Sequence, residues 1–363
     1  VGGGGVEGGG SEGRGRRRRS ERIVGERAGE GGLREPGPVV ATVTRAPHRG
    51  AACGENFLVV GGVERDGRDG IRWAAAGPIA LAGAAGWGQS QTITRRLAFL
   101  GGGTMATAII GGLIKQGFPR YHFEVVEPVV DARQLLRDKF YITAHEHPGA
   151  FLNGVDMVVW AVKPQTFREA ALRVRVHTKS ALHLSVAAGI PSDSIARWLD
   201  SDRVVRSMPN TPALIGLGIT GLFARPGVSD VDRIWIERIV ETMGQLLWVE
   251  REDLLDAVTA ISASGPAYVF YFMEAMITAG TEMGLPHEQA YKLAVETFFG
   301  ASALAHASSE PPEILRQRVT SKGGTTHAAI TVMDDKHVKA LFVQAMHAAE
   351  RRAKELGQEY GRD

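Results

Sequence analysis

A glycine-rich turn between an apolar run and a helix-like stretch constrains this chain more than any other feature. The run at 96–100 is typical of a buried parallel strand, and residues 104–116 follow the pattern of a helix. The turn fits G-x-G-x-x-A and consists of Gly101, Gly102, Gly103, Thr104, Met105 and Ala106. In this setting the glycines permit a tight turn and a close approach to a pyrophosphate, and the helix N-terminus supplies amide donors. The sequence therefore predicts a dinucleotide-binding βαβ unit.

An acidic residue stands where such a unit meets the adenosine ribose. Glu127 closes a second predicted strand, 24 residues after Gly103. A carboxylate at this place accepts the ribose hydroxyls and repels a 2′-phosphate. The nearest arginine that follows is Arg133. We therefore expect NADH to be accepted, and the sequence leaves NADPH open.

Strand-like and helix-like segments alternate from residue 95 to about residue 250. We predict strands at 96–100, 122–127, 156–162, 180–187, 204–207, 219–224 and 246–250, and helices at 104–116, 130–140, 166–174, 192–199 and 230–243. After Glu252 the strand pattern stops, and helices are predicted at 253–283, 286–306, 311–319 and 326–357. The fold class is therefore an α/β Rossmann-type doubly wound domain at 95–250, followed by an all-α domain at 251–363.

Residues 1–94 differ in composition from the remainder of the chain. They hold 24 of the 46 glycines and 13 arginines but no lysine, and the first methionine is Met105. Such a segment buries too little apolar surface to offset its chain entropy, so we predict a disordered Gly/Arg/Ala-rich extension. The apolar stretch 73–87 is interpreted as linker, because it is shorter than the ~20 residues of a membrane helix. Our hypothesis for the extension is an upstream start of translation.

Charge and cysteine content exclude several classes of protein. The 42 basic and 40 acidic residues nearly balance, which argues against a strongly cationic nucleic-acid binder. A single cysteine, Cys53, excludes a disulfide framework and a cysteine-rich metal site. The segment 145–147, His-Glu-His, is interpreted as a solvated loop and not as a metal site. We expect a cytoplasmic protein that needs no metal, membrane or nucleic acid.

Further loops of unusual composition follow the predicted elements. Segments 161–165, 185–189 and 208–212 lie at the carboxyl ends of strands, where doubly wound sheets bind ligands. Residues 319–326, VTSKGGTT, interrupt two predicted helices with hydroxyls, glycines and one lysine. This loop is either a carboxylate receptor or a flexible connection capped by Thr325 or Thr326, and its composition alone favours neither.

Over residues 95–363 the chain resembles the pyrroline-5-carboxylate reductase family. The resemblance rests on GGGTMA at 101–106, AVKPQ at 161–165, SVAAG at 185–189, MPNTP at 208–212, EDLLDAVTAISASGPAYVF at 252–270 and TSKGGTT at 320–326. The last two motifs are specific to this family, whereas the first is shared by many dehydrogenases. Lys322 stands where the family often has proline, and residues 1–94 have no counterpart in the family pattern.

The resemblance implies an enzyme that reduces the C=N bond of L-Δ1-pyrroline-5-carboxylate to L-proline with a hydride from NADPH or NADH. It also implies a homodimer, or a ring of dimers, in which two chains share each active site. The cofactor would contact the motif 101–106 and Glu127, Ala161, Val162, Lys163, Pro164, Ala187, Ala188, Gly189 and Asn210. The substrate would contact Glu252, Ser321, Gly323, Gly324, Thr325 and Thr326, of which Ser321 and Thr326 would be catalytic.

Other functions fit parts of the sequence less well. A β-hydroxyacid dehydrogenase would need a lysine followed by an asparagine one helical turn later, and no such pair occurs after residue 250. A non-catalytic dinucleotide sensor would not need an intact 320–326 loop. Reduction of a cyclic imine needs a well-placed hydride donor and a polarised nitrogen, and the Thr326 hydroxyl is the best candidate to orient that nitrogen.

Overall fold

The computed structural model describes residues 42–44, 59–66, 70–74 and 95–362. The chain divides into unit 1–38, which lies outside the described residues, and unit 39–363. Within the predicted extension, β1 (Thr42–Thr44), β2 (Val59–Asp66) and β3 (Gly70–Ala74) form a three-stranded antiparallel sheet. The sequence analysis did not anticipate these strands. The rest of the extension, including Cys53 and most of the 73–87 stretch, lies outside the described residues.

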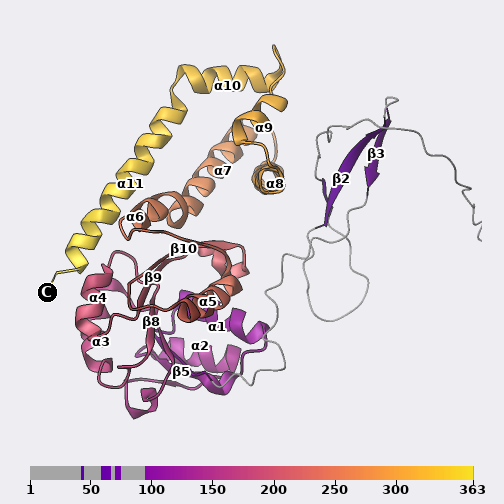
Figure 1. The fold of residues 1–363 in the computed structure, drawn as a ribbon. Coiled ribbons are helices and arrows are strands. Elements are labelled where there is room, and N and C mark those ends of the chain that lie inside the picture. The colour runs from indigo at the N-terminus through magenta and orange to yellow at the C-terminus, as the bar shows by residue number, and fades with distance from the viewer. Residues whose placement is uncertain (1–41, 45–58, 67–69, 75–94, 363) are drawn as a thin grey trace, which may run out of the picture. The chain divides into compact units, whose positions relative to one another are not determined.

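An eight-stranded sheet forms the centre of the region that follows (Figure 1). Its order is β11-β10-β9-β8-β7-β4-β5-β6. The strands are β4 (Leu97–Leu100), β5 (Phe123–Val126), β6 (Ala144–His145), β7 (Met157–Trp160), β8 (Leu182–Ser185), β9 (Val204–Met208), β10 (Gly218–Ala224) and β11 (Gly244–Trp248). Every neighbouring pair is parallel except β9 and β10. Because β5 and β7 lie on opposite sides of β4, the winding reverses there, and this is where such sheets bind ligands.

Helices cover both faces of this sheet. They are α1 (Thr104–Lys115), α2 (Val130–Phe140), α3 (Pro164–Val174), α4 (Ser192–Leu199) and α5 (Asp230–Val240). Leu97 and Phe99 of β4 pack in the core that contains α1, α2 and α5, whereas Ala98 and Leu100 pack in the core that contains α3 and α4. A strand buried on both faces is apolar without alternation, which explains the run at 96–100. The Rossmann-type, doubly wound prediction is confirmed.

The described residues after β11 form helices. The elements are α6 (Leu254–Val258), a π-helical turn (Thr259–Ala263), α7 (Gly265–Glu282), α8 (His287–Ala307), α9 (Pro312–Arg318), α10 (Thr325–Asp335) and α11 (Val338–Tyr360). None of the helices in the part of the chain that the structure describes is long and apolar enough to cross a bilayer.

Two of the predicted helices are each interrupted in the structure, so the prediction that they are continuous is wrong. The segment 253–283 is divided at the π-helical turn, where the amide of Ser264 donates to the carbonyl of Thr259. Pro266, the second residue of α7, has no amide donor. The segment 326–357 is divided at His337, which has a φ of 54°. Small and apolar residues continue across the first break, so the sequence pattern did not reveal it. The second break lies in four polar residues, 334–337, a local signal that the sequence analysis missed.

A buried histidine lies in the Rossmann core. His183 of β8 is fully buried, and its Nδ1 accepts a hydrogen bond from the indole Nε1–H of Trp160 at 3.1 Å. Its Nε2 has no hydrogen-bond partner among the described residues. Burial, helped by the nearby Arg203 guanidinium, lowers the pKa of His183 to about 3. The imidazole is therefore neutral in the folded chain at neutral pH.

This histidine makes stability depend on pH. Its pKa is about 6.5 when unfolded and about 3 when folded, so between these values only the unfolded chain binds the proton. Its contribution to the free energy of unfolding is complete above pH 6.5 and falls by about 1.4 kcal/mol per pH unit below it. We expect His183→Gln, whose side-chain oxygen can accept the Trp160 bond, to lose this part of the slope in denaturant titrations across that range. Equal slopes for the two chains would contradict the assignment.

Candidate active site

The predicted cofactor loops meet at the carboxyl edge of the sheet. The amide of Gly101 donates to the carbonyl of Val126 at 2.8 Å, and the amide of Ala161 donates to the carbonyl of Leu100 at 2.8 Å. These bonds extend the ladder beyond β4, β5 and β7 and hold the three strand ends beside one another. The structure therefore brings the 101–106, 127 and 161–164 segments together, as predicted.

The glycine turn forms a cradle that side chains would fill. Gly101 has a φ of +95°, and a Cβ there would lie 2.5 Å from the carbonyl oxygen of Ala161. Gly103 is exposed, and a Cβ there would meet no atom within 4 Å. Helix α1 begins after Gly103 without a side-chain cap or an acidic residue in its first turn. Open space in front of uncapped amides fits a pyrophosphate group.

Glu127 is tied to this cradle. Its side chain is only 7% exposed. One carboxylate oxygen accepts the amide of Gly102 at 2.6 Å, and the other accepts the amide of Val129 at 2.7 Å. Glu127 therefore fixes the middle of the glycine turn and keeps a negative charge at the end of β5.

Two further predicted contacts lie in loops at the same edge. Lys163 is exposed and precedes Pro164, the first residue of α3. Asn210 follows β9, and its Oδ1 accepts the amide of Ile219 at 3.0 Å, which fixes the loop and leaves its NH₂ group for another acceptor. Both side chains follow strands whose carboxyl ends lie at the cofactor edge.

The 187–189 loop contacts the end of the chain. Ala187 is buried and Ala188 is exposed. Gly189 has a φ of +75°, and a Cβ there would lie 3.1 Å from the Cβ of Leu356 in α11. The last helix therefore packs on this loop, so Gly189 serves packing as well as its predicted place near the cofactor.

The 320–326 loop forms the start of α10. Gly323 has a φ of +75°, and Gly324 occupies the N-cap position, with its amide donating to the carbonyl of Ser321 at 3.0 Å. Thr325 and Thr326 are the first helical residues, so the alternative of a threonine-capped connection is wrong. The first turn has no side-chain cap and no acidic residue. Uncapped amides beside hydroxyl groups can receive a carboxylate.

Glu252 is not brought together with that loop in one chain. Its carboxylate accepts the amide of Ser192 at 2.6 Å and the guanidinium of Arg206 at 2.5 Å, and it also contacts the Ser192 hydroxyl. Figure 1 shows α6 beside the sheet and α10 at the opposite end of the helical region. The sequence analysis missed Ser192 and Arg206, because contacts across 60 and 46 residues leave no local signal.

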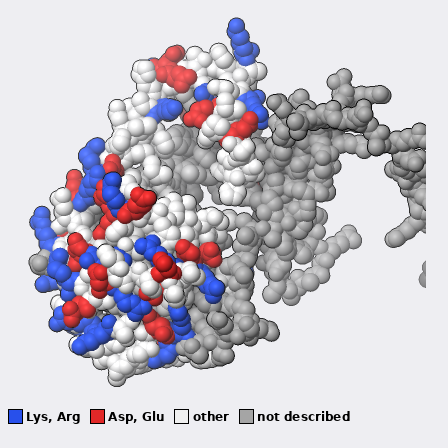
Figure 2. Space-filling view, in the orientation of Figure 1, with Lys and Arg blue, Asp and Glu red and all other residues white. Residues whose placement is uncertain are grey.

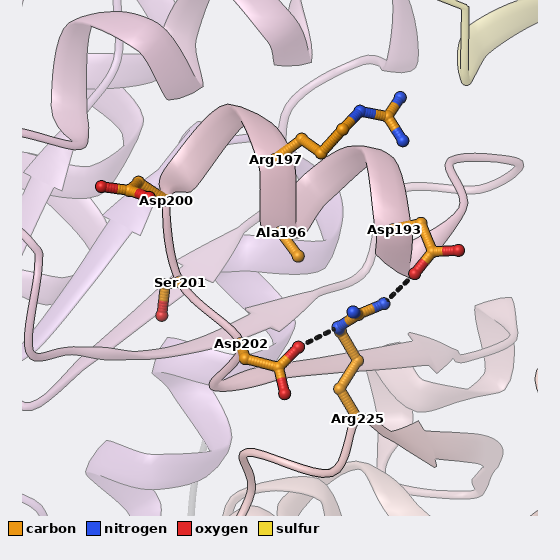
Figure 3. Close-up of a pocket in the computed structure, with 7 residues that line it drawn as sticks. All are labelled: Asp193, Ala196, Arg197, Asp200, Ser201, Asp202 and Arg225. Atoms are coloured by element: carbon orange, nitrogen blue, oxygen red, sulfur yellow. Dashed lines mark hydrogen bonds and ion pairs between the residues drawn. The ribbon is translucent and has the colours of Figure 1, made fainter.

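A hollow of about 520 Å³ beside α4 holds a supporting ion cluster (Figure 3). The guanidinium of Arg225 lies between the carboxylates of Asp193 and Asp202 and donates to the Ser192 hydroxyl at 3.2 Å. Burial disfavours the charge on Arg225, but these hydrogen bonds and charges outweigh it and raise its pKa. The cluster supports the turn that holds Glu252.

Metal ligation has no constellation to support it in the described part of the chain. No group of three or more His, Cys, Asp or Glu side chains among these residues is placed to hold an ion.

The interpretation of 145–147 as a loop is wrong for His145, which belongs to the short strand β6 and pairs with Val126 of β5.

Comparison with known proteins identifies relatives of both halves of the chain. Residues 252–356 match the family model for pyrroline-5-carboxylate reductase dimerisation, and residues 96–189 match the family model described as NADP oxidoreductase, coenzyme F420-dependent. The pyrroline-5-carboxylate reductase of Pseudomonas aeruginosa is 40% identical over 270 residues, which cover 74% of this chain and 99% of that protein. The pyrroline-5-carboxylate reductase of Arabidopsis thaliana is 32% identical, with 72% and 96% covered.

Two solved structures of pyrroline carboxylate reductases resemble this chain in fold. The pyrroline-5-carboxylate reductase of Coxiella burnetii superposes with a TM-score of 0.69 at 35% identity and covers 72% of this chain and 98% of its own. The Plasmodium falciparum pyrroline carboxylate reductase, solved with NADP bound, has a TM-score of 0.66 at 24% identity and covers 74% and 100%, which supports the fold.

Two glycine variants separate folding from ligand binding. Gly101→Ala puts a methyl group against the Ala161 carbonyl at a positive φ, so we expect a lower melting temperature and weak dinucleotide binding. Gly103→Ala meets nothing in the folded chain, so we expect an unchanged melting temperature but a dinucleotide affinity about tenfold weaker or worse. Thermal unfolding and dinucleotide titration measure both. Full affinity in Gly103→Ala would remove the turn from the binding site.

Proposed function

Because the chain belongs to the pyrroline-5-carboxylate reductase family, we infer that it reduces L-Δ1-pyrroline-5-carboxylate to L-proline with NAD(P)H, the last step of proline biosynthesis. One observation carries this conclusion beyond the family likeness. The same chain holds a pyrophosphate cradle at Gly101–Gly103 and an uncapped helix start at Thr325, which suits a carboxylate. A dinucleotide and a small carboxylate substrate are what this reductase must bind.

We propose that residues 95–250 form the dinucleotide-binding domain and residues 251–363 the domain for dimerisation and substrate. The last strand of the sheet ends at Trp248 and the first helix of the second region begins at Leu254, which supports a boundary near Glu250.

The exposed apolar side chains of the helical region suggest that the chain associates with a second copy. Large apolar side chains there are exposed; among them are Phe270, Tyr271, Leu293, Val332 and Leu341, each more than half exposed. An apolar surface of this kind marks an interface between protein chains. The match of 252–356 to the family's dimerisation model supports a second copy as the partner. We propose a homodimer, alone or within a ring of dimers.

We propose further that two chains complete each active site. The cofactor cradle lies at the sheet, and the 320–326 loop precedes α10 at the far end of the helical region (Figure 1). The loop of one chain would therefore reach the sheet edge of its partner. Within this arrangement the cofactor and substrate contacts keep the assignments that the family resemblance implies.

In the reaction, bound NAD(P)H supplies the hydride that adds to the carbon of the C=N bond. The amides at the start of α10, with the Ser321 and Thr325 hydroxyls, would hold the substrate carboxylate. The ring nitrogen would acquire its proton largely from solvent, and the Thr326 hydroxyl oxygen would accept a hydrogen bond from the protonated nitrogen and so orient the ring. Catalysis would rest mainly on positioning, because a cyclic imine is already basic and electrophilic.

The proposal extends to the cellular location of the enzyme and to its binding of nucleic acid. We propose a cytoplasmic enzyme, as the single cysteine suggests, that does not bind nucleic acid. Figure 2 shows acidic and basic side chains interspersed on one face of the described residues, without a broad area of one sign.

The direct test is oxidation of NADH or NADPH by the purified chain with pyrroline-5-carboxylate, followed by absorbance and by detection of proline. Substrate-dependent oxidation with an equal amount of proline is expected. Cofactor binding without oxidation would favour the dinucleotide sensor instead.

Thr326→Ala tests the catalytic loop. We expect turnover to fall on the order of 100-fold, because the hydrogen-bond partner that orients the reacting nitrogen is lost, while dinucleotide affinity stays unchanged. Thr326→Ser should recover most of the turnover. The control is Thr331→Ala on the same helix, whose hydroxyl donates to the carbonyl of His327 and which should stay active. Full turnover in Thr326→Ala would remove this residue from the mechanism.

A further inference from the structure

Glu127 lies at the part of the candidate cofactor site where the two nicotinamide dinucleotides differ. This inference rests on the proposed function, since it concerns the same cradle. The two dinucleotides differ only at the adenosine ribose, where NADPH has a 2′-phosphate and NADH a hydroxyl. In doubly wound folds, the end of the second strand of the unit meets this ribose. Here that place is Glu127, which directly follows β5.

Glu127 cannot readily leave the ribose position. Its two carboxylate oxygens accept the amides of Gly102 and Val129 at 2.6 and 2.7 Å. Its Cγ would lie 3.2 Å from a Cβ on Gly102, so it packs directly under the glycine turn. Each carboxylate oxygen still has a lone pair for a ribose hydroxyl. A 2′-phosphate would instead face an immobile negative charge.

The charged side chains around Glu127 do not offset its repulsion of a 2′-phosphate. A cation, Arg133, lies beside it, and its Nη1 donates to the carbonyls of Glu127 and Pro128 at 2.8 and 2.7 Å. Its Nη2 faces the carboxylate of Glu146 at 3.3 Å. Asp131, in the first turn of α2, is a further acidic residue beside this strand end. The one arginine is thus already bound among acidic groups and carbonyls, and a phosphate would have to displace these contacts.

We propose that Glu127, held by the amides of Gly102 and Val129, makes this chain select NADH and reject the 2′-phosphate of NADPH. Once the Glu127 carboxylate is removed, the repulsion ends, and Arg133 would meet the phosphate with its Nη2, which gives up only the 3.3 Å contact to the exposed Glu146. The preference is therefore set by one fixed side chain and can be reversed without rebuilding the site.

The test is the ratio of dissociation constants for NADPH and NADH, measured by nicotinamide fluorescence on the full chain without substrate. We expect the unchanged chain to bind NADH more tightly, by about 10- to 100-fold. Glu127→Gln and the smaller Glu127→Ser should bring the ratio near or below one. Adding Arg133→Ala to either variant should weaken NADPH binding again but leave NADH binding alone.

The ratio separates selection from support of the turn. Loss of the hydrogen bonds to Gly102 and Val129 would weaken both dinucleotides equally and would not move the ratio. The matched control is Glu124→Gln on the same strand, whose carboxylate pairs with Arg96 at 2.7 Å and which should keep the original ratio. Tighter or equal binding of NADPH by the unchanged chain, or an unchanged ratio in both Glu127 variants, would overturn the inference alone. Binding of neither dinucleotide would overturn the proposed function with it.

Discussion

The carboxylate of Glu252 joins the two halves of this protein. It accepts the amide and hydroxyl of Ser192, at the start of α4, and the guanidinium of Arg206, which is only 9% exposed on β9. Removing Glu252 would leave the nearly buried guanidinium of Arg206 unpaired; because the side chain of Glu252 is 25% exposed, the cost is below the about 3–5 kcal/mol of a fully buried pair. Arg225 and its two aspartates hold the Ser192 turn from the other side. The first helix of the helical region is thereby fixed against the sheet.

This attachment determines where the other parts of the site lie. With α6 held at the sheet, α7 leads away from it, and α11 returns to pack on Gly189. The 320–326 loop is left at the far end, and large apolar side chains stay exposed along the helices. A second copy accounts for both features at once, because it would cover the apolar surface and bring its own loop to the cofactor edge. Each active site would then be complete only in the dimer.

The features that the sequence predicted well are those with local causes. The strand, turn and helix around Gly101 follow from residue size and backbone freedom, and the packing against Ala161 agrees with them. Contacts between distant segments left no pattern. The partners of Glu252 lie far from it in the sequence, and the π-helical turn after Val258 lies in a stretch of small and apolar residues. The break at His337 had a local signal, the polar run 334–337, which was not used. The acidic residue at 127 was visible in the sequence, but its bonds to two amides, which make it immobile, required the structure.

In the proposed dimer, each active site takes its cofactor loop from one chain and its substrate loop from the other. Co-expression of Gly103→Ala and Thr326→Ala chains under different tags tests it directly. At a dinucleotide concentration well below the dissociation constant of Gly103→Ala, each variant alone lacks one working half of every site. If two chains share the site, a mixed dimer keeps one intact site, and an equal mixture should recover about a quarter of the normal turnover. Mixed dimers that stay as inactive as their parents would contradict the account, because each chain would then build its site alone.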